Sequence, residues 1–378
     1  MRCAKILNGA FFMIIISFAK KNIVMCVALF AALLTSIFVP VDKSYIGYFD
    51  FKTLSCLFCV LAVVCALKNI NFFYILAQKI VHLFKNTRAA ILALVYITFI
   101  GSMLIANDMA LLTFLPLGYF VLSTTGKEKY MAFTFIMQNI AANLGGMLTP
   151  FGNPQNLYLF TRFNIPTAEF VKIMLLPFTV SVLIITLCCL FIKPEPLYVE
   201  DVHPHMSKSR TFIYLLLFTL SILIVFRSIH YLYGLIIIPL ALFFLDRKAL
   251  KMVDYPLLLT FVFFFVFAGN MARIDIVQNI FSFLLQKSTL LFSVLSCQLI
   301  SNVPSAILLS QFTQNYPELL VGVNIGGVGT LISSLASLIT LREYVKYNPE
   351  KTLSYIGMFS AFNFAFLAVL TCTEYIFI

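Results

Sequence analysis

The feature that most constrains this chain is the recurrence of long apolar runs. Runs of about 15 to 25 residues follow one another along nearly all of the chain, and each has the length of a helix that crosses a bilayer. A transmembrane barrel would instead need short segments of alternating polarity. Charged residues make up only 11% of the sequence, against about 25% in soluble domains. The sequence therefore predicts an all-α polytopic membrane protein with about ten transmembrane helices.

Basic residues are distributed unevenly among the polar segments. The chain has 26 Lys and Arg against 15 Asp and Glu, a formal net charge of +11. Such an excess also occurs in proteins that bind nucleic acid, but here the clusters fall on alternate loops, as the positive-inside rule requires. The cytoplasmic set lies near residues 68–88, 193–210, 247–251 and 342–351. We expect a multi-pass protein of a bacterial cytoplasmic membrane, surrounded by lipid and without a nucleic-acid partner.

The first 21 residues resemble a signal peptide, with basic residues followed by an apolar core. No small-residue cleavage site follows this core; Lys20 and Lys21 follow it instead. We therefore expect a retained short N-terminal helix, and leave open whether residues 6–19 span the membrane.

The chain carries none of the motifs that mark an enzyme or a cofactor site. It has no His-Glu-x-x-His, no Gly-x-Ser-x-Gly and no paired intramembrane Asp. Its nine Cys lie mostly within apolar runs, without metal-ligand spacing or a disulfide framework. We expect no enzyme, no structural metal and no cofactor other than a coupling ion.

An internal repeat is the most informative pattern. ANLGGMLTPFG at residues 142–152 aligns without gaps with VNIGGVGTLIS at residues 323–333. Each copy follows a pair of short apolar segments around a polar tip, IANDMA in the first copy and ISNVPSA in the second. The loop charges give the two copies opposite orientations. Inverted repeats with interrupted helices at matching positions are typical of secondary transporters.

The repeat divides the chain into four parts: a short N-terminal helix (1–21), repeat 1 (22–192), a cytoplasmic linker (193–210) and repeat 2 (211–378). Each repeat is expected to hold a re-entrant hairpin, at 89–123 and 288–313, and a broken helix, at 130–160 and 317–340. Such backbone must be buried in protein or line a cavity, because lipid offers no hydrogen bonds. A helix lying at the interface precedes each hairpin, at 68–86 and 270–287.

The broken helices carry candidate binding residues. Gly145, Gly146 and Gly152 predict unusual backbone angles and close approach, and Pro150 and Pro154 end the helix. Freed carbonyls and nearby amide or hydroxyl groups can bind a cation or a substrate, and half-helix N-termini favour anions. The candidates are Asn143, Thr149, Gly152, Asn153 and Asn156 in repeat 1, and Asn324, Thr330 and Ser333 in repeat 2. The alternatives are a kink, close packing, or threonine bonds to their own helix.

Both hairpin tips carry polar residues that are costly inside a membrane. Asp108 is the only carboxylate in residues 89–127, and it predicts a site for a proton or Na⁺. Asn107, Ser301 and Asn302 offer donors and acceptors for an anion or a cation. The structural alternative for all four residues is capping of the helix that follows.

Four charged residues outside the apolar runs are interpreted as interface or surface residues and not as part of a binding site. Arg162 and Arg227 are interpreted as anchors near the membrane interface, with attraction of anions as the alternative. Arg273 and Asp275 fall on the predicted interfacial helix, where we expect a solvated pair.

At the broken-helix and hairpin residues the chain resembles the ion transporter superfamily. That group includes citrate-type anion permeases, divalent anion–sodium symporters, arsenite permeases and a branch of sodium–proton antiporters. TPFGNPQN is similar to its broken-helix motif and ISNVPSA to its second hairpin tip, and the resemblance covers residues 46–376. It implies two inverted repeats, a scaffold and a mobile part that moves like an elevator. It also implies Na⁺ near Asn107, Gly152 and Asn302, and a homodimer.

The chain departs from that pattern at both tips. Dicarboxylate symporters carry Ser-Asn-Thr there, whereas this chain has Ala106-Asn107-Asp108 and Ser301-Asn302-Val303, and its second broken helix lacks Gly-x-Pro-x-Asn. These differences leave the substrate and the coupling ion open. We expect a secondary active transporter for a small carboxylate or inorganic oxyanion, coupled to Na⁺ or H⁺. The alternatives are a Na⁺/H⁺ antiporter or an arsenite-type efflux permease of the same fold.

Overall fold

The computed structural model describes residues 22–81, 83–197 and 208–377. In that part of the chain the regular structure is helical, and the one strand-like contact is an isolated bridge between Asn86 and Pro196. The all-α class predicted from the apolar runs is confirmed. The predicted helix at 1–21 and most of the linker at 193–210 lie outside the described residues.

The helices follow the order predicted for two repeats. Repeat 1 comprises α2 (Ile23–Phe38), the three-ten turn η1 (Lys43–Tyr48), α3 (Phe51–Asn69), α4 (Phe72–Val81), α5 (Thr87–Ile105), α6 (Asn107–Thr124), η2 (Glu128–Tyr130), α7 (Met131–Gly145), η3 (Gly146–Leu148), α8 (Pro154–Arg162) and α9 (Thr167–Leu190). Repeat 2 comprises α10 (Lys208–Val225), α11 (Tyr231–Leu245), α12 (Arg247–Met252), α13 (Tyr255–Met271), α14 (Asp275–Lys287), α15 (Thr289–Ile300), α16 (Asn302–Leu309), α17 (Tyr316–Ile325), α18 (Leu335–Tyr347), η4 (Pro349–Lys351) and α19 (Thr352–Phe377).

Several of these helices have the length and composition of membrane spans. Among the described residues five qualify on these criteria, namely α3, α5, α9, α10 and α19 with its preceding turn. α13 and α14 would qualify together as a sixth, but the chain bends by 97° between them. This bend is the predicted change from a span to a helix lying at the interface. α2, α11 and α15 are shorter apolar helices, and the pairs α7–α8 and α17–α18 are the predicted broken spans.

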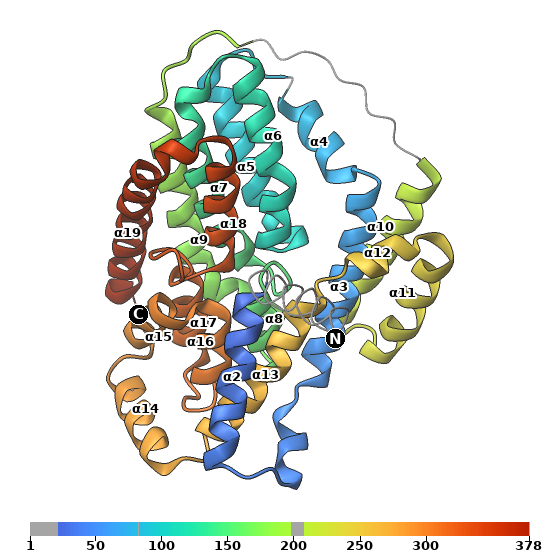
Figure 1. Cartoon of the computed structure of the whole chain (residues 1–378), viewed down its shortest axis with the longest axis vertical. Coiled ribbons are helices and arrows are strands. Elements are labelled where there is room, and N and C mark those ends of the chain that lie inside the picture. Colours follow the sequence, from blue (N-terminus) through green and yellow to red (C-terminus); the bar gives the residue numbers. More distant parts are fainter. Residues whose placement is uncertain (1–21, 82, 198–207, 378) are drawn as a thin grey trace, which may run out of the picture.

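The two repeats have the same element order and opposite orientation. The series α3, α4, hairpin α5–α6, broken pair α7–α8 and α9 corresponds to α13, α14, hairpin α15–α16, broken pair α17–α18 and α19. In Figure 1, α4 and the first hairpin lie in the upper part of the molecule, whereas α14 and the second hairpin lie in the lower part. The hairpins therefore enter from opposite ends, as an inverted repeat requires.

Packing separates two kinds of element. The helices at the start of each repeat pack against helices of the other repeat: α2 lies along α13, and α10 and α11 lie against α3 (Figure 1). The hairpins pack on the broken helices, α5 and α6 on α7, and α15 and α16 on α17, and α16 also packs on the span α13. The broken helices contact one another crosswise, α7 with α18 and α8 with α17. Each half of the central site is thus completed by the other repeat.

Glycines at the first break permit close packing, as predicted. A Cβ atom at Gly145 would overlap the carbonyl oxygen of Phe99 on α5, and one at Gly146 would overlap the Asn153 side chain. A Cβ atom at Gly152 would overlap the Gly146 carbonyl. None of the three glycines has a positive φ, so the expectation of unusual backbone angles is wrong for them. Their role is to let the hairpin and the break approach each other.

The pairing predicted between Arg273 and Asp275 is also wrong. The Arg273 guanidinium pairs with Asp42 in the loop after α2, with Nη2 2.7 Å from Oδ2, and donates to the Tyr48 hydroxyl at 3.0 Å. Asp275 is instead the first residue of α14, where the helix dipole favours a carboxylate. The pair connects positions 231 residues apart, which local sequence patterns do not show.

A three-way contact at Glu195 holds the base of the first hairpin. Its carboxylate accepts from Lys127 and Lys129, both at 2.6 Å, and from the Tyr130 hydroxyl at 2.9 Å. Its backbone carbonyl accepts from the Thr87 amide at 2.8 Å. These side-chain hydrogen bonds lower the pKa of Glu195 to about 2, and the bond from Lys127 has the largest effect. The end of α9 is thereby tied to both ends of the hairpin.

We predict that Glu195→Gln lowers the thermal unfolding midpoint at pH 7. A carboxyl whose pKa is lower in the folded state stabilises the fold above its unfolded pKa, and the benefit disappears as pH falls from the ordinary value of 4.5 toward about 2. Unfolding midpoints of both proteins between pH 7 and pH 3 should therefore converge as the pH falls. Glu350→Gln, at an exposed position on η4, is the matched control and should show no such convergence.

We also predict that Gly145→Ala destabilises the protein, because the new methyl group would overlap the Phe99 carbonyl. Overpacking of this kind costs about 1–3 kcal/mol. Gly357→Ala is the control, since nothing lies within 4 Å of a Cβ atom there. Thermal unfolding of purified protein should show a lower midpoint for Gly145→Ala alone, and equal midpoints would contradict the close approach.

Candidate substrate and ion site

The two hairpin tips have the same strained backbone. Ala106, between α5 and α6, has φ 65° and ψ 151°, and Ser301, between α15 and α16, has φ 74° and ψ 161°. This region is normally occupied by glycine, and a residue with a Cβ pays about 1–3 kcal/mol to adopt it. Two such residues at equivalent positions indicate a tip geometry that the surrounding packing imposes.

The asparagine after each strained residue is the first residue of its helix, and its side-chain oxygen accepts from the next backbone amide. The Oδ1 atom of Asn107 accepts from the Asp108 amide at 3.0 Å, and that of Asn302 accepts from the Val303 amide at 2.9 Å. Neither helix has a side-chain cap, since Ala106 and Ser301 hold the N-cap positions without such a hydrogen bond, so capping, the structural alternative, is absent at both tips. Asn107 also donates to Oδ1 of Asn143 on α7 at 3.2 Å. The oxygen of each asparagine is thus used locally, and the side-chain nitrogen of Asn107 serves a partner on another helix.

Asn324 connects the two broken helices. Its Nδ2 donates to Oδ1 of Asn156 at 2.6 Å, and its Oδ1 accepts from Asn153 at 3.3 Å and Gln155 at 3.5 Å. Asn156 in turn donates to carbonyls freed by the first break, including that of Gly146 at 3.2 Å. These predicted residues are therefore brought together, and they lie buried behind the tips.

The two predicted threonines have a role that the sequence did not suggest. Oγ1 of Thr149 donates to the Met103 carbonyl at 2.7 Å, and Oγ1 of Thr330 donates to the Gln298 carbonyl at 3.1 Å. Met103 and Gln298 each lie three residues before the strained residue of a tip. In the described structure the threonines therefore tie each break to the adjacent hairpin arm, instead of bonding to their own helix.

Ser333 and Gly152 also belong to the breaks. The Ser333 carbonyl accepts from the Asn302 amide at 2.9 Å and from Oγ of Ser301 at 3.2 Å, so it fixes the second tip. Gly152, the equivalent residue in repeat 1, closes a turn by donating to the Thr149 carbonyl at 3.2 Å.

A small cavity of about 50 Å³ lies where the two tips meet. The helices α6, α8, α16 and α18 all begin at it, with Asn107, Pro154, Asn302 and Leu335 as their first residues. Four helix N-termini direct the positive ends of their dipoles toward one space, which favours an anion. The amides of Asp108, Asn302 and Val303 already donate to oxygen atoms of the protein. The spans α2 and α13 close the cavity from the other side with Val24, Leu257, Thr260 and Phe264.

Four predicted residues line this cavity directly: Asn107, Asp108, Ser301 and Asn302. Three further polar residues line the cavity and were not among the predicted site residues: Gln155, Thr260 and Ser334. Ser334 aligns with Asn153 in the repeat, and both residues occupy the N-cap position of a half-helix, so the alignment held the signal. Thr260 comes from a span outside the repeat motif and had no comparable signal.

Asp108 is the one ionisable residue among the described residues that line the cavity. Its Oδ1 and the Oε1 of Gln155 are buried and have no hydrogen-bond partner in the described structure. Two acceptors without donors in one small space suit a proton or a cation bound by oxygen atoms. Elsewhere in the described residues no group of three or more His, Cys, Asp or Glu could hold a metal ion.

Paired hairpins, crossed broken helices and a buried cavity at the tips together define a membrane transporter. Comparison with known families agrees, because the model of the citrate transporter family matches residues 11–318. The chain belongs to the citrate transporter family, and the ion transporter superfamily resemblance is confirmed.

Individual relatives are consistent with this assignment. An uncharacterized transporter of Methanocaldococcus jannaschii is 37% identical over 313 residues, covering 82% of this chain and 85% of that protein. The inner membrane protein YbiR of Escherichia coli is 30% identical over 317 residues, covering 81% and 84%. Among solved structures, the YdaH transporter of Alcanivorax borkumensis has a TM-score of 0.52 at 12% identity, covering 92% of this chain and 96% of that one. At this identity the likeness concerns the fold alone.

The tip geometry yields a prediction for Ala106→Gly. Glycine adopts positive φ without steric cost, so the substitution should raise the unfolding free energy by about 1 kcal/mol, net of its greater unfolded-state entropy. Ala110→Gly on the same helix is the control, because it lies within α6 and should lose about 1 kcal/mol. Thermal unfolding of purified protein checks both, and a loss of stability in Ala106→Gly would contradict the strained tip.

Proposed function

We propose that this protein is a secondary active transporter that carries a small carboxylate or inorganic oxyanion across a bacterial cytoplasmic membrane. The observation that carries the proposal is the meeting of four helix N-termini at one cavity. Amide and hydroxyl groups of Asn107, Ser301, Asn302 and Ser334 surround the same space. Such a set of neutral donors can replace the hydration of an anion without binding it too tightly to be released.

Coupling to Na⁺ or H⁺ is proposed at Asp108. An ionised carboxylate at this cavity repels a substrate anion; two unit charges 4 Å apart interact by about 4 kcal/mol at an effective dielectric of 20. Binding of a proton or Na⁺ at Asp108 removes that repulsion. The acceptor Oε1 of Gln155 beside it offers a further ligand for Na⁺. Anion and cation binding would then favour each other, which is the requirement for symport.

Transport also requires movement, which we propose to be elevator-like. A cavity of about 50 Å³ holds a few water molecules, whereas pockets for organic ligands have volumes of about 300 Å³ or more. The tips must therefore separate from α2 and α13 to admit substrate. The division between spans that pack across the repeats and hairpins that pack on broken helices supports movement of the latter as one body. We extend the proposal to a homodimer, as the superfamily resemblance implies.

Two alternatives share this fold, a Na⁺/H⁺ antiporter and an arsenite-type efflux permease. The antiporter is favoured by the unpartnered, buried Oδ1 of Asp108, since one carboxylate that binds H⁺ and Na⁺ in turn is sufficient for exchange. Such a protein would need no organic anion.

Purified protein in liposomes with an imposed Na⁺ gradient and an internal pH dye separates these possibilities. We predict proton or Na⁺ flux only after addition of a transported anion, tested with citrate, succinate, sulfate and arsenite. Asp108→Asn should reduce coupled flux by about tenfold or more, because the site for the coupling ion is lost. Asp275→Asn, at an exposed position on α14, is the matched control and should transport normally.

The outcomes are distinct. Na⁺-driven proton movement without any anion, abolished by Asp108→Asn, would establish the antiporter in place of the symporter. Unaltered anion flux in both Asn107→Ala and Asn302→Ala would overturn the proposed site.

A further inference from the structure

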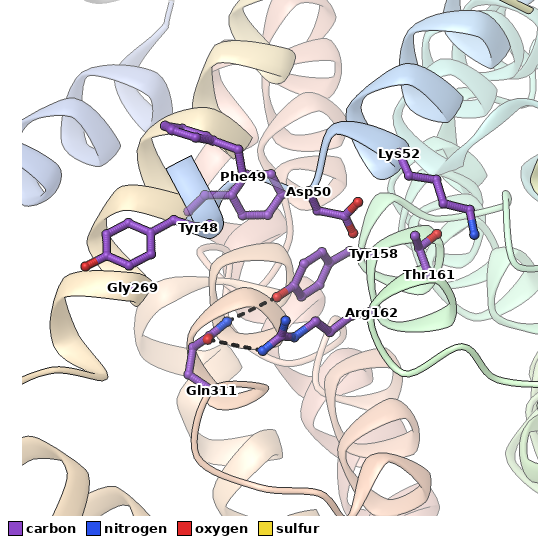
Figure 2. Close-up of a pocket in the computed structure, with 11 residues that line it drawn as sticks. Tyr48, Phe49, Asp50, Lys52, Tyr158, Thr161, Arg162, Gly269 and Gln311 are labelled. Carbon is purple, nitrogen blue, oxygen red and sulfur yellow. Dashed lines mark hydrogen bonds between the residues drawn. The ribbon is translucent and has the colours of Figure 1, made fainter. Parts of the chain in front are cut away.

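A second and larger cavity lies at the opposite end of α8 from the tips. Its volume is about 360 Å³, and it is lined by polar residues that include Lys52, Tyr158, Arg162 and Gln311. Figure 2 shows these side chains around one space, contributed by α3, α8 and the chain just after α16. The loops that surround it are on the side predicted to be outside by the charge pattern. Unlike the tip cavity, it is large enough for a small organic anion.

Two cations of this cavity are weakly engaged. The guanidinium of Arg162 makes one long contact, from Nη2 to Oε1 of Gln311 at 3.5 Å (Figure 2). Lys52 is half-buried and forms no salt bridge within the described residues. A guanidinium that keeps most of its donors unused is suited to bidentate binding of a carboxylate or an oxyanion.

The negative groups nearby are already occupied. Asp50 also lines the cavity, but its Oδ1 and Oδ2 accept from the Thr53 amide at 2.9 Å and the Thr53 hydroxyl at 2.6 Å, where it caps α3. The C-terminal end of α8 is partly negative, and Arg162 lies in its last turn, where it offsets that charge. Asp50 keeps its charge, so Lys52 and Arg162 together leave the described lining of the cavity with one net positive charge.

One element joins this cavity to the tip cavity. Pro154 and Gln155 at the start of α8 line the tip cavity, and Tyr158, Thr161 and Arg162 line the larger one. The Tyr158 hydroxyl lies 2.8 Å from Oγ of Ser310, at the end of the second hairpin. The larger cavity is also walled by Phe265 and Gly269 of α13, so it lies between the hairpin group and the spans.

We propose that this cavity is an outer anion-binding site, at which a small carboxylate or oxyanion binds to Arg162 and Lys52 before it reaches the tips. The inference rests on the proposed anion transport and adds a separate binding step to it. Binding would replace the contact between Arg162 and Gln311 by charge-assisted hydrogen bonds to the anion. The anion-attracting role of Arg162, an alternative at the level of sequence, is thereby assigned to a specific cavity.

A cysteine at Thr161 tests the site without any transport measurement. Thr161 lines the cavity and is half-buried. Purified Thr161→Cys protein is reacted with a negatively charged and with a positively charged methanethiosulfonate, and labelling is followed by intact-protein mass spectrometry. Each rate is divided by the rate of the same reagent with a free thiol. The chain without Thr161→Cys provides the background from its native cysteines.

We expect the normalised rate to favour the negative reagent, and millimolar citrate to slow labelling. Arg162→Gln should slow the negative reagent and accelerate the positive one by about fourfold each, the effect of one unit charge at about 5 Å in water, so the preference should fall by about sixteenfold. Arg162→Lys retains the charge and should restore the preference, while Gln311→Ala removes only a neutral contact. Lys52→Gln provides a second, independent loss of charge.

Equal normalised rates for the two reagents would overturn the site. Protection by neither citrate nor inorganic phosphate would also overturn it, with glycerol as the uncharged control. Protection by inorganic phosphate but not by citrate would exclude a carboxylate as its ligand. In liposomes Arg162→Gln should raise KM for the anion about fourfold with little change in the maximal rate. Labelling that behaves as expected in a protein without anion flux would retain the outer site and reject the proposed function.

Discussion

Side-chain amides that replace lost backbone hydrogen bonds are the interaction on which this structure depends. Each break in a helix frees carbonyl groups that lipid cannot satisfy. In repeat 1, Asn156 donates to the Gly146 and Met147 carbonyls at 3.2 and 3.3 Å. In repeat 2, Gln298 donates to the Gly326 carbonyl at 2.9 Å and accepts from the Thr330 amide at 2.9 Å. Both repeats satisfy the carbonyl groups freed at a break with side-chain amides, from the half-helix α8 in repeat 1 and from the hairpin arm α15 in repeat 2.

That solution also explains why the tips and the breaks behave as one unit. Gln298 belongs to a hairpin arm, and Thr149 and Thr330 bind the arms of their own hairpins, so each break is held by the hairpin beside it. Asn324 then connects the breaks to each other. A group joined internally by hydrogen bonds, and contacting α2 and α13 through mostly apolar residues, can move against those spans without leaving buried polar groups unpaired. This is the physical basis for assigning movement to the hairpin group.

The sequence predicted the local features, hairpins and helix breaks, well. It predicted backbone angles and salt-bridge partners poorly. Two hairpins and two breaks were recognised because Gly, Pro and Asn interrupt long apolar runs at matching places. Gly145, Gly146 and Gly152 were expected to adopt unusual angles, yet they have no positive φ. Positive φ occurs at Ala106 and Ser301 of the tips and at Gly329 of the second break. Arg273 was paired with its neighbour Asp275, whereas its actual partner is Asp42.

The sequence by itself determined the fold class and the inverted repeat, because hydrophobic length and the positions of helix-breaking residues are local properties. It also selected Asp108 as a candidate residue, and the structure places Asp108 at the tip cavity. Only the tertiary structure decided that four helix N-termini face one cavity, that Gln155 and Thr260 join it, and that Arg162 lies in a second cavity beyond α8. Those facts depend on contacts between the two repeats, and nothing in either repeat alone specifies how the other will pack against it.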